Sequence, residues 1–103
     1  MITQLVLLTR RSDMSRQEMS DYWKNVHGPI AEKMPNVHKY VQYHTKPDGG
    51  EALDGIALLQ FDDEDAMNAS WGSPEGKATS EDIPKFLDPN KVVIIVTEAH
   101  EVV

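Results

Sequence analysis

The sequence contains no cysteine, which excludes a disulfide framework, a thiol nucleophile and a zinc–thiolate site. It also contains no apolar run long enough to span a bilayer, and no signal-peptide pattern of basic, apolar and small-residue segments. From these absences we expect a cytoplasmic protein that makes no contact with a membrane.

Basic residues are also scarce. Ten Lys and Arg stand against 17 Asp and Glu, and the formal net charge is −7. Nucleic-acid binding needs clustered basic side chains, and here they are scattered, so we expect no nucleic-acid partner. The densest acidic run, Asp62–Asp65, lacks the spacing of a calcium loop and fits a helix start, where acids complement the helix dipole. We therefore expect no metal site.

A chain of 103 residues has room for one modest core, so residues 1–103 are assigned to a single domain. Apolar patterning and turn residues predict, in chain order, a strand, a helix, two strands, an interrupted helix and a last strand, with a turn over 46–50. These elements are expected near residues 2–9, 15–27, 37–44, 55–61, 63–82 and 91–97. The order β-α-β-β-α-β predicts an α+β, ferredoxin-like fold, a four-stranded antiparallel sheet with its helices on one face.

Capping residues mark the helix starts. Ser15 followed by Glu18 has the spacing of a capping box. Ser73-Pro74 restarts the second helical segment after an interruption at Gly72, since proline is well tolerated in a first helical turn. Both signals place helix boundaries without reference to the rest of the chain.

Three predicted strands do not alternate apolar and polar residues, as a sheet with one wet face should. Leu5–Leu8, Ile56–Leu59 and Val92–Val96 are nearly continuous aliphatic runs. Two helices can cover only one face of the sheet, so another surface must cover the second face. In a chain this short we expect that surface to be a second copy, forming a homodimer through the sheet face.

The stretch from Tyr22 to Pro29 carries the most distinctive chemistry. Apolar residues recur there at the spacing of one helical face, at Met19, Tyr22, Trp23, Val26 and Ile30. His27 lies inside this stripe, and Gly28-Pro29 imposes an irregularity directly after it. A titratable ring on a packed face fits a small acid–base site. It equally fits a hydrogen-bonded core histidine.

The predicted strand 37–44 is more polar than its neighbours. One face carries His38, Tyr40, Gln42 and His44. This pattern fits an edge strand or a strand that lines a pocket, and the sequence does not fix which face points toward the helices. We expect His44 and His100 to lie in solvent.

Several segments together resemble the EthD-domain family of the dimeric α/β-barrel superfamily. They are DMSRQEMSDYWKNVHGPIAEKMPNVHKYVQYH, DGIALLQFDDEDAM and DIPKFLD, which begin at residues 13, 54 and 82. The resemblance implies the ferredoxin-like fold and a dimer in which two sheets close into an α/β barrel. It also implies a pocket between sheet and helices, with the motif histidine at His27 and the motif tyrosine at Tyr40.

In such a pocket we expect His27 to act as general acid or base, because burial keeps its ring neutral. Tyr40, with His38 beside it, can hold an enolate or phenolate oxygen. His27, Tyr40 and His38 are therefore the candidate catalytic residues, and no cofactor is required. The wall around a small, flat, hydrophobic or aromatic ligand is assigned to Tyr22, Trp23, Val26, Met67, Trp71 and Phe86.

The resemblance implies several functions, and the residues leave them open. One is a cofactor-independent isomerase or lyase that performs isomerisation, cyclisation or decarboxylation on a small aromatic, polyketide-like or lactone substrate. Another is a non-catalytic accessory or ligand-binding protein of a catabolic pathway, of the ether-degradation type. A cofactor-free monooxygenase is a further enzymatic alternative. The last is a dimer whose pocket has no function.

Overall fold

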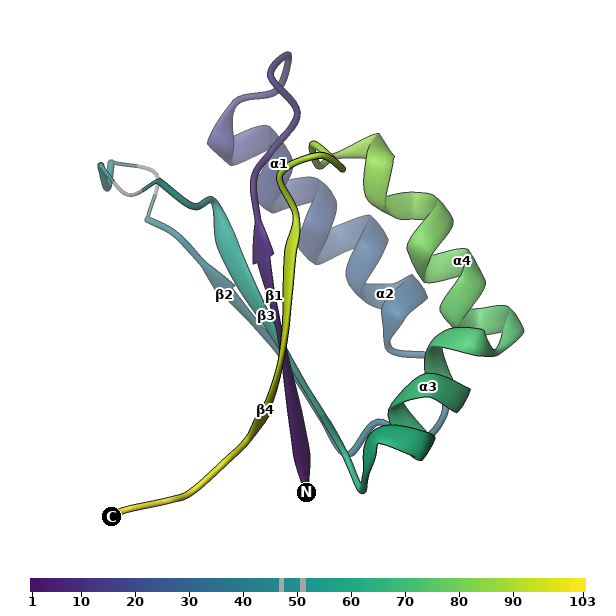
Figure 1. Cartoon of the computed structure of the whole chain (residues 1–103). Coiled ribbons are helices and arrows are strands. Elements are labelled where there is room, and N and C mark those ends of the chain that lie inside the picture. Colours follow the sequence, from purple (N-terminus) through teal and green to yellow (C-terminus); the bar gives the residue numbers. More distant parts are fainter. Residues whose placement is uncertain (47, 51) are drawn as a thin grey trace.

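A computed structural model describes residues 1–46, 48–50 and 52–103. Its four strands form one antiparallel sheet in the order β2-β3-β1-β4, with the helices on one face (Figure 1). The strands are β1 (Ile2–Leu8), β2 (Lys39–His44), β3 (Gly55–Phe61) and β4 (Val93–Glu98). The predicted α+β, ferredoxin-like fold is confirmed.

The helices fall into two groups in chain order. The first group is α1 (Arg16–Tyr22), the π-helix η1 (Trp23–His27) and α2 (Gly28–Ala31), and the second is α3 (Glu64–Gly72), α4 (Pro74–Asp82) and the 3₁₀-helix η2 (Ile83–Lys85). The predicted capping box is present, because Glu18 N donates to Ser15 Oγ at 3.0 Å and Ser15 N donates to Glu18 Oε1 at 2.9 Å. Ser73 caps α4 as expected, with Pro74 in the first turn.

The π-helix changes which residues of the first helical group are buried. Pro29 lacks an N–H, so an unbroken ladder of i to i+4 bonds is not available there, and Gly28 N–H instead bonds to Trp23 O five residues earlier. The wider turn stacks residues that are four apart, and the buried positions are Met19, Trp23, His27 and Ala31. Val26, which we placed on the buried stripe and in the pocket wall, is 43% exposed.

The register of the sheet establishes which face of β2 points toward the helices. Tyr40 pairs with Leu59, and His44 pairs with Gly55, and both partners in β3 are buried. Neighbouring residues of paired strands share a face. Tyr40, Gln42 and His44 therefore face the helices.

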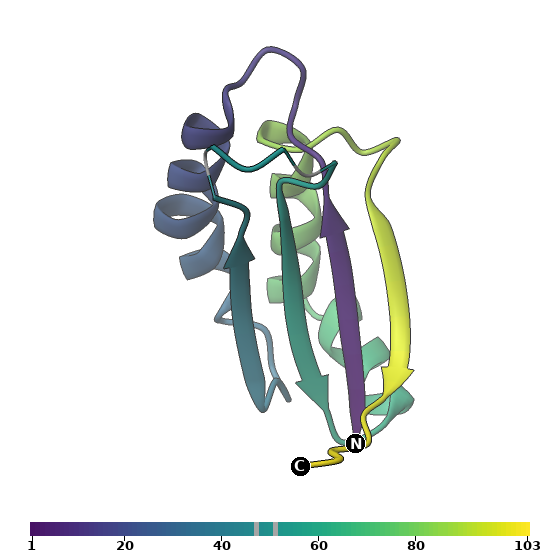
Figure 2. The ribbon, with the colours of Figure 1, turned by 90° about the vertical axis from the view of Figure 1, so that its left-hand side faces the viewer.

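The opposite face of the sheet is bare in a single chain, and Figure 2 shows no helix in front of it. Leu5, Leu7, Ile56 and Leu58 project there and are half-buried. The edge strand β4 is more open still, with Val93 to Val96 between 40% and 59% exposed. Burial of these strands on both faces, as their composition predicts, therefore requires a surface outside the single chain.

A buried carboxylate joins the first helix to the loop before β3. Arg16 Nε donates to Asp54 Oδ1 at 2.9 Å, and Arg10 N donates to Asp54 Oδ2 at 2.8 Å. Burial opposes ionisation of Asp54, but hydrogen bonds from both arginines and the charge of Arg10 outweigh it and lower its pKa. Arg16 also donates to Gly49 O at 2.6 Å, which ties the predicted turn at 46–50 to α1. Pro47 of that turn lies outside the described residues.

Gly55→Ala should destabilise the protein, because a Cβ there would lie 2.6 Å from Trp23 Cζ3 and 3.0 Å from Tyr43 O. We expect a loss of ~1–3 kcal/mol in unfolding free energy, the usual cost of overpacking. Gly72→Ala is the matched control, since nothing lies within 4 Å of its Cβ position and alanine favours a helix. Urea unfolding followed by circular dichroism measures both. Equal stability of the two variants would show that Trp23 does not pack against Gly55.

Candidate functional site

A small cavity lies between the inner face of the sheet and the helices. Its volume is about 30 Å³, enough for about one water molecule. Strands β1, β2 and β3 supply its floor, and both helical groups supply its walls. The lining residues are Val6, Leu8, Trp23, His27, Ala31, Tyr40, Ala57, Leu59, Trp71, Thr79, Ile83, Phe86 and Leu87.

His27 is held at this cavity by a buried carboxylate. Its Nδ1 lies 2.9 Å from Asp82 Oδ2, and the two residues are only 6% and 3% exposed. Tyr22 donates its hydroxyl proton to Asp82 Oδ1 at 2.8 Å, and Lys85 Nζ lies 3.7 Å from the same oxygen. A buried carboxylate requires such partners, because an unpaired charge in the interior is costly.

The contacts of His27 define its protonation state. Burial lowers the pKa of His27, and the hydrogen bond and charge of Asp82 only partly oppose this shift, so the ring is neutral near pH 7. A carboxylate can only accept hydrogen bonds, so the ring proton resides on Nδ1. Nε2 then carries the lone pair, and it has no hydrogen-bond partner among the described residues. His27 is therefore suited to accept a proton at Nε2.

Tyr22 remains a proton donor to Asp82 over the physiological range. Partial burial, the hydrogen bond to Asp82 and the negative charge of Asp82 raise the pKa of Tyr22 to about 12. Its ring also stacks on Phe86, with the centroids 5.2 Å apart. Phe86 in turn contacts the ring of His27, at 4.7 Å between centroids. Tyr22 thus supports His27 through Asp82 and Phe86.

Tyr40 reaches the cavity from the sheet. Gln42 Nε2 donates to its hydroxyl oxygen at 2.9 Å and to Trp23 O at 3.1 Å. Burial raises the pKa of Tyr40, and the hydrogen bonds from its neighbours only partly offset this. Tyr40 therefore stays protonated near neutral pH.

The structure brings together only some of the residues predicted for the site. Those that line the cavity are His27, Tyr40, Trp23, Trp71 and Phe86. Tyr22 contributes through Asp82, whereas Met67 is a buried core residue that does not line the cavity. Val26 is exposed on the outside of the helix.

Two histidines lie elsewhere than expected. The side chain of His38, which we placed beside Tyr40, is 47% exposed and lies 2.7 Å from Asp62 Oδ1, away from the cavity. His44, which we expected in solvent, is half-buried and contacts the ring of Trp23 in a tilted arrangement, with ring centroids 4.3 Å apart. Burial and the charge of Lys24 lower the pKa of His44. Packing of β2 against the helix causes this difference.

Sequence reasoning missed Asp82 and Gln42. Asp82 is 55 residues from His27, and this separation leaves no local pattern that pairs them. The sequence does contain a signal for a buried acid at this position. Thr79, Asp82 and Ile83 have the spacing of one helical face, and this face is the buried side of α4. Gln42 shared a strand face with Tyr40 in the sequence, but its contact with Trp23 depends on the π-helix.

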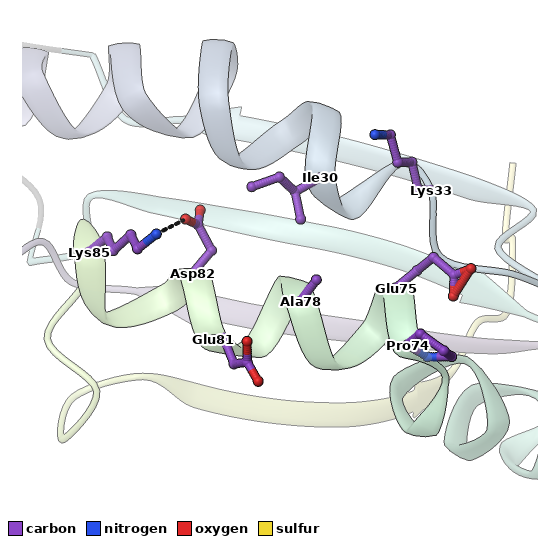
Figure 3. A pocket seen from close by; sticks show the side chains of 8 residues that line it. All are labelled: Ile30, Lys33, Pro74, Glu75, Ala78, Glu81, Asp82 and Lys85. Atoms are coloured by element: carbon purple, nitrogen blue, oxygen red, sulfur yellow. Dashed lines mark ion pairs between the residues drawn. The ribbon is translucent and has the colours of Figure 1, made fainter.

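A separate groove runs along the outside of the molecule between α2 and α4 (Figure 3). Its volume is about 500 Å³, and its walls carry charges of both signs from Lys33, Glu75, Glu81 and Lys85. Asp82 lines this groove as well, with Lys85 beside it. The carboxylate of Asp82 thus lies between the outer groove and the side chain of His27.

Two further findings concern ligands and membranes. Within residues 1–46, 48–50 and 52–103, no group of three His, Cys, Asp or Glu side chains is arranged to hold a metal ion. No helix in this part of the chain has the length and apolar character needed to cross a membrane.

The fold and the site define a ferredoxin-like protein with a buried histidine–aspartate pair beneath an antiparallel sheet. The sequence model of the EthD domain matches residues 11–90, which is most of the chain. The chain therefore belongs to the EthD-domain family. The comparison with curated proteins gave no match.

Several solved structures share the fold. An ethyl tert-butyl ether D (EthD) family protein from Bacillus halodurans superposes with a TM-score of 0.80 at 20% identity, covering 97% of this chain and 100% of its own. A dimeric ferredoxin-like protein of unknown function from Thermobifida fusca has a TM-score of 0.76 at 14% identity, covering 95% and 90%. SnoaB, a cofactor-independent oxygenase from Streptomyces nogalater, has a TM-score of 0.70 at 10% identity, covering 97% and 93%.

The lowered pKa of His27 predicts how stability depends on pH. The unfolded chain binds a proton near the ordinary histidine pKa of about 6.5, whereas the folded chain does so only at lower pH. Unfolding free energy should therefore fall as the pH drops from about 6.5 toward the folded pKa of His27. This fall in unfolding free energy should be smaller in His27→Gln. It should not vanish, because the lowered pKa of His44 also reduces stability as the pH drops.

Urea unfolding of both proteins at about pH 7.5 and about pH 5.5 measures this difference. His100→Gln is the control, because His100 is exposed near the end of the chain and should leave the pH dependence unchanged. An identical pH dependence in wild type and His27→Gln would contradict burial of a neutral His27.

Proposed function

We propose that this protein is a small cofactor-independent enzyme that moves a proton on a small aromatic, polyketide-like or lactone substrate. The observation that carries the proposal is the neutral His27, fixed by Asp82 and facing the same cavity as Tyr40. A general base needs a free lone pair and a pKa near or below the working pH. His27 meets both conditions.

The proposed step is a proton transfer between carbon and nitrogen. His27 Nε2 takes a proton from a carbon next to a carbonyl group, and the electron pair of the C–H bond moves to the carbonyl oxygen to give an enolate. Tyr40 stabilises that oxygen by hydrogen bonding. The imidazolium is stabilised by Asp82 and returns its proton to another carbon for isomerisation.

The cavity is too small for an organic ligand, so it must widen when such a ligand binds. Benzene has been bound in an engineered cavity of about 150 Å³, which is well above the 30 Å³ found here. The lining residues that retain some exposure are Tyr40, Trp71 and Ile83. Trp71 is tethered by Nε1, which donates to Gln4 Oε1 at 2.8 Å, so Ile83 at the start of η2 is the freest of the three. We propose that the cavity opens at Ile83.

A non-catalytic binding protein of a catabolic pathway is the second candidate. The closed, mostly apolar lining favours it, since such a cavity can bind a hydrophobic molecule without chemistry. A cofactor-free monooxygenase is a further alternative, because SnoaB shares the fold. Proton removal by His27 would also begin that reaction.

We further propose that two chains form a homodimer through the bare face of the sheet, with their sheets closing into an α/β barrel. The half-buried aliphatic residues of β1 and β3 and the exposed ones of β4 support this proposal, because monomeric proteins seldom expose large apolar patches. The Thermobifida fusca protein of the same fold is also described as dimeric.

Proton exchange tests the catalytic role. In D₂O, wild-type protein should speed deuterium incorporation at the α-carbon of α-angelica lactone, an enolisable lactone, as followed by NMR. His27→Gln should lower this rate by about 10²-fold or more, because the base is lost. His100→Gln is the control and should exchange at the wild-type rate.

The same samples separate the alternatives. Binding of the lactone by wild type and His27→Gln, measured by calorimetry, with no exchange above background would favour the binding protein. Neither binding nor exchange, for the lactone and for 2-naphthol as a phenolic probe, would contradict both pocket functions.

Sedimentation equilibrium tests the dimer. Ile95→Lys places a charge on the bare face of the sheet, opposite Leu5, and should weaken association. Val26→Lys is the matched control, because Val26 and Ile95 are 43% and 40% exposed but Val26 lies on the helix. A wild-type protein that sediments as a monomer at micromolar concentration, or equal loss of dimer in both variants, would contradict the sheet interface.

A further inference from the structure

The side-chain amide of Gln42 bridges β2 and the π-helix. Its Nε2 lies 2.9 Å from the Tyr40 hydroxyl oxygen and 3.1 Å from Trp23 O. A carbonyl oxygen can only accept, so the atom facing it must be the amide nitrogen. That nitrogen has two hydrogens and does not accept hydrogen bonds. Tyr40 is therefore the acceptor in its contact with Gln42.

The other end of the amide agrees with this orientation. Gln42 Oε1 lies 2.8 Å from His44 Nε2, so His44 donates there and its ring proton resides on Nε2. His44 Nδ1 then accepts from the Ser20 hydroxyl, 2.6 Å away. Ser20 thus donates to His44, His44 donates to Gln42, and Gln42 donates to Tyr40 at the cavity.

The hydroxyl hydrogen of Tyr40 is not used in this network. The Tyr40 hydroxyl accepts a hydrogen bond from Gln42, and the Trp23 side chain, whose indole N–H can only donate, also acts on it as a donor that lowers its pKa. The Tyr40 hydroxyl is therefore free to donate into the cavity that Tyr40 lines together with His27. We propose that Gln42 is a positioning residue that fixes Tyr40 as a hydrogen-bond donor to the ligand.

This arrangement restricts the class of substrate, on the assumption that the proposed function holds. Tyr40 offers a proton, and His27 Nε2 offers a lone pair. A neutral carbonyl compound with an acidic proton near its oxygen satisfies both groups. An ether without an acidic proton leaves His27 unpaired. A protonated amine has only N–H donors, so it cannot accept the hydrogen bond that Tyr40 offers.

The π-helix and the glycine that follows it provide the space for Gln42. Trp23 O accepts from Gly28 N–H across the wide turn as well as from Gln42. A Cβ on Gly28 would lie 2.9 Å from Gln42 Nε2 and 3.2 Å from Trp23 O. Only glycine lets the amide approach this carbonyl closely. The irregularity in the helix therefore serves Gln42 as well as His27.

The first test needs no ligand and is a titration of Tyr40. In protein labelled with 3-fluorotyrosine, ¹⁹F NMR can follow the three tyrosines, assigned with single Tyr→Phe variants. Gln42→Met keeps the length of the side chain but has no N–H to donate. Loss of the donor should raise the pKa of Tyr40, and Tyr43, exposed on the outer face, serves as the internal control. An unchanged Tyr40 pKa in Gln42→Met would overturn the proposal.

Gly28→Ala gives an independent displacement of Gln42 and should raise the pKa of Tyr40 in the same way. If Gln42→Met folds poorly, Gly28→Ala still tests the proposal. Gly72→Ala, which crowds no atom, is the control and should leave the Tyr40 pKa at the wild-type value. A Gly28→Ala protein that is folded and titrates like wild type would count against the role of Gln42.

Gln42→Glu tests the direction of the Tyr40 hydroxyl. A carboxylate accepts but does not donate, so Tyr40 should turn its proton toward residue 42 and away from the cavity. Exchange of α-angelica lactone should then fall by about 10²-fold, the usual effect of losing one such donor. Exchange at the wild-type rate would overturn the proposal. A wild-type protein that exchanges nothing, together with a raised Tyr40 pKa in Gln42→Met, would refute the proposed function alone.

Discussion

The buried carboxylate of Asp82 is the constraint on which the rest of the site depends. An ionised group in the interior is costly unless it is paired, and Asp82 at the end of α4 finds its partners in the first helical group. His27 and Tyr22 each occupy one of its oxygens. The second helical group therefore cannot shift along the first without leaving this charge unpaired. The orientation of His27 is a consequence of that restriction.

The π-helix meets a second requirement of the site. It brings His27 into line with Trp23 on the buried side, and it presents the carbonyl of Trp23 to Gln42. A regular α-helix would direct the face around Val26 inward, whereas in the π-helix the Trp23 carbonyl accepts from both Gly28 N–H and Gln42. The local cause is Pro29, which cannot donate a backbone hydrogen bond. One irregular turn thus supports both polar groups of the cavity.

Most of the fold could be predicted because its signals are local. The capping box at Ser15, the restart at Ser73-Pro74 and the aliphatic strands each depend on a few neighbouring residues, and the structure confirms them. The site was only partly predictable. His27 was a candidate from the apolar spacing of its helix, and the family motif added to it and to Tyr40, whereas Asp82 was missed because its partner lies 55 residues away. Val26 was misplaced because helical periodicity assumes regular turns.

The two polar groups of the cavity are oriented independently of each other. His27 is fixed within the helical layer by Asp82, and Tyr40 is fixed from the sheet by Gln42. The structure gives no hydrogen bond between His27 and Tyr40 among the described residues. Gln42 also donates to Trp23 O, so the orientation of Tyr40 depends on contact between the sheet and the first helical group. Groups that are oriented before binding lose little freedom when a ligand arrives, which favours both affinity and transition-state stabilisation.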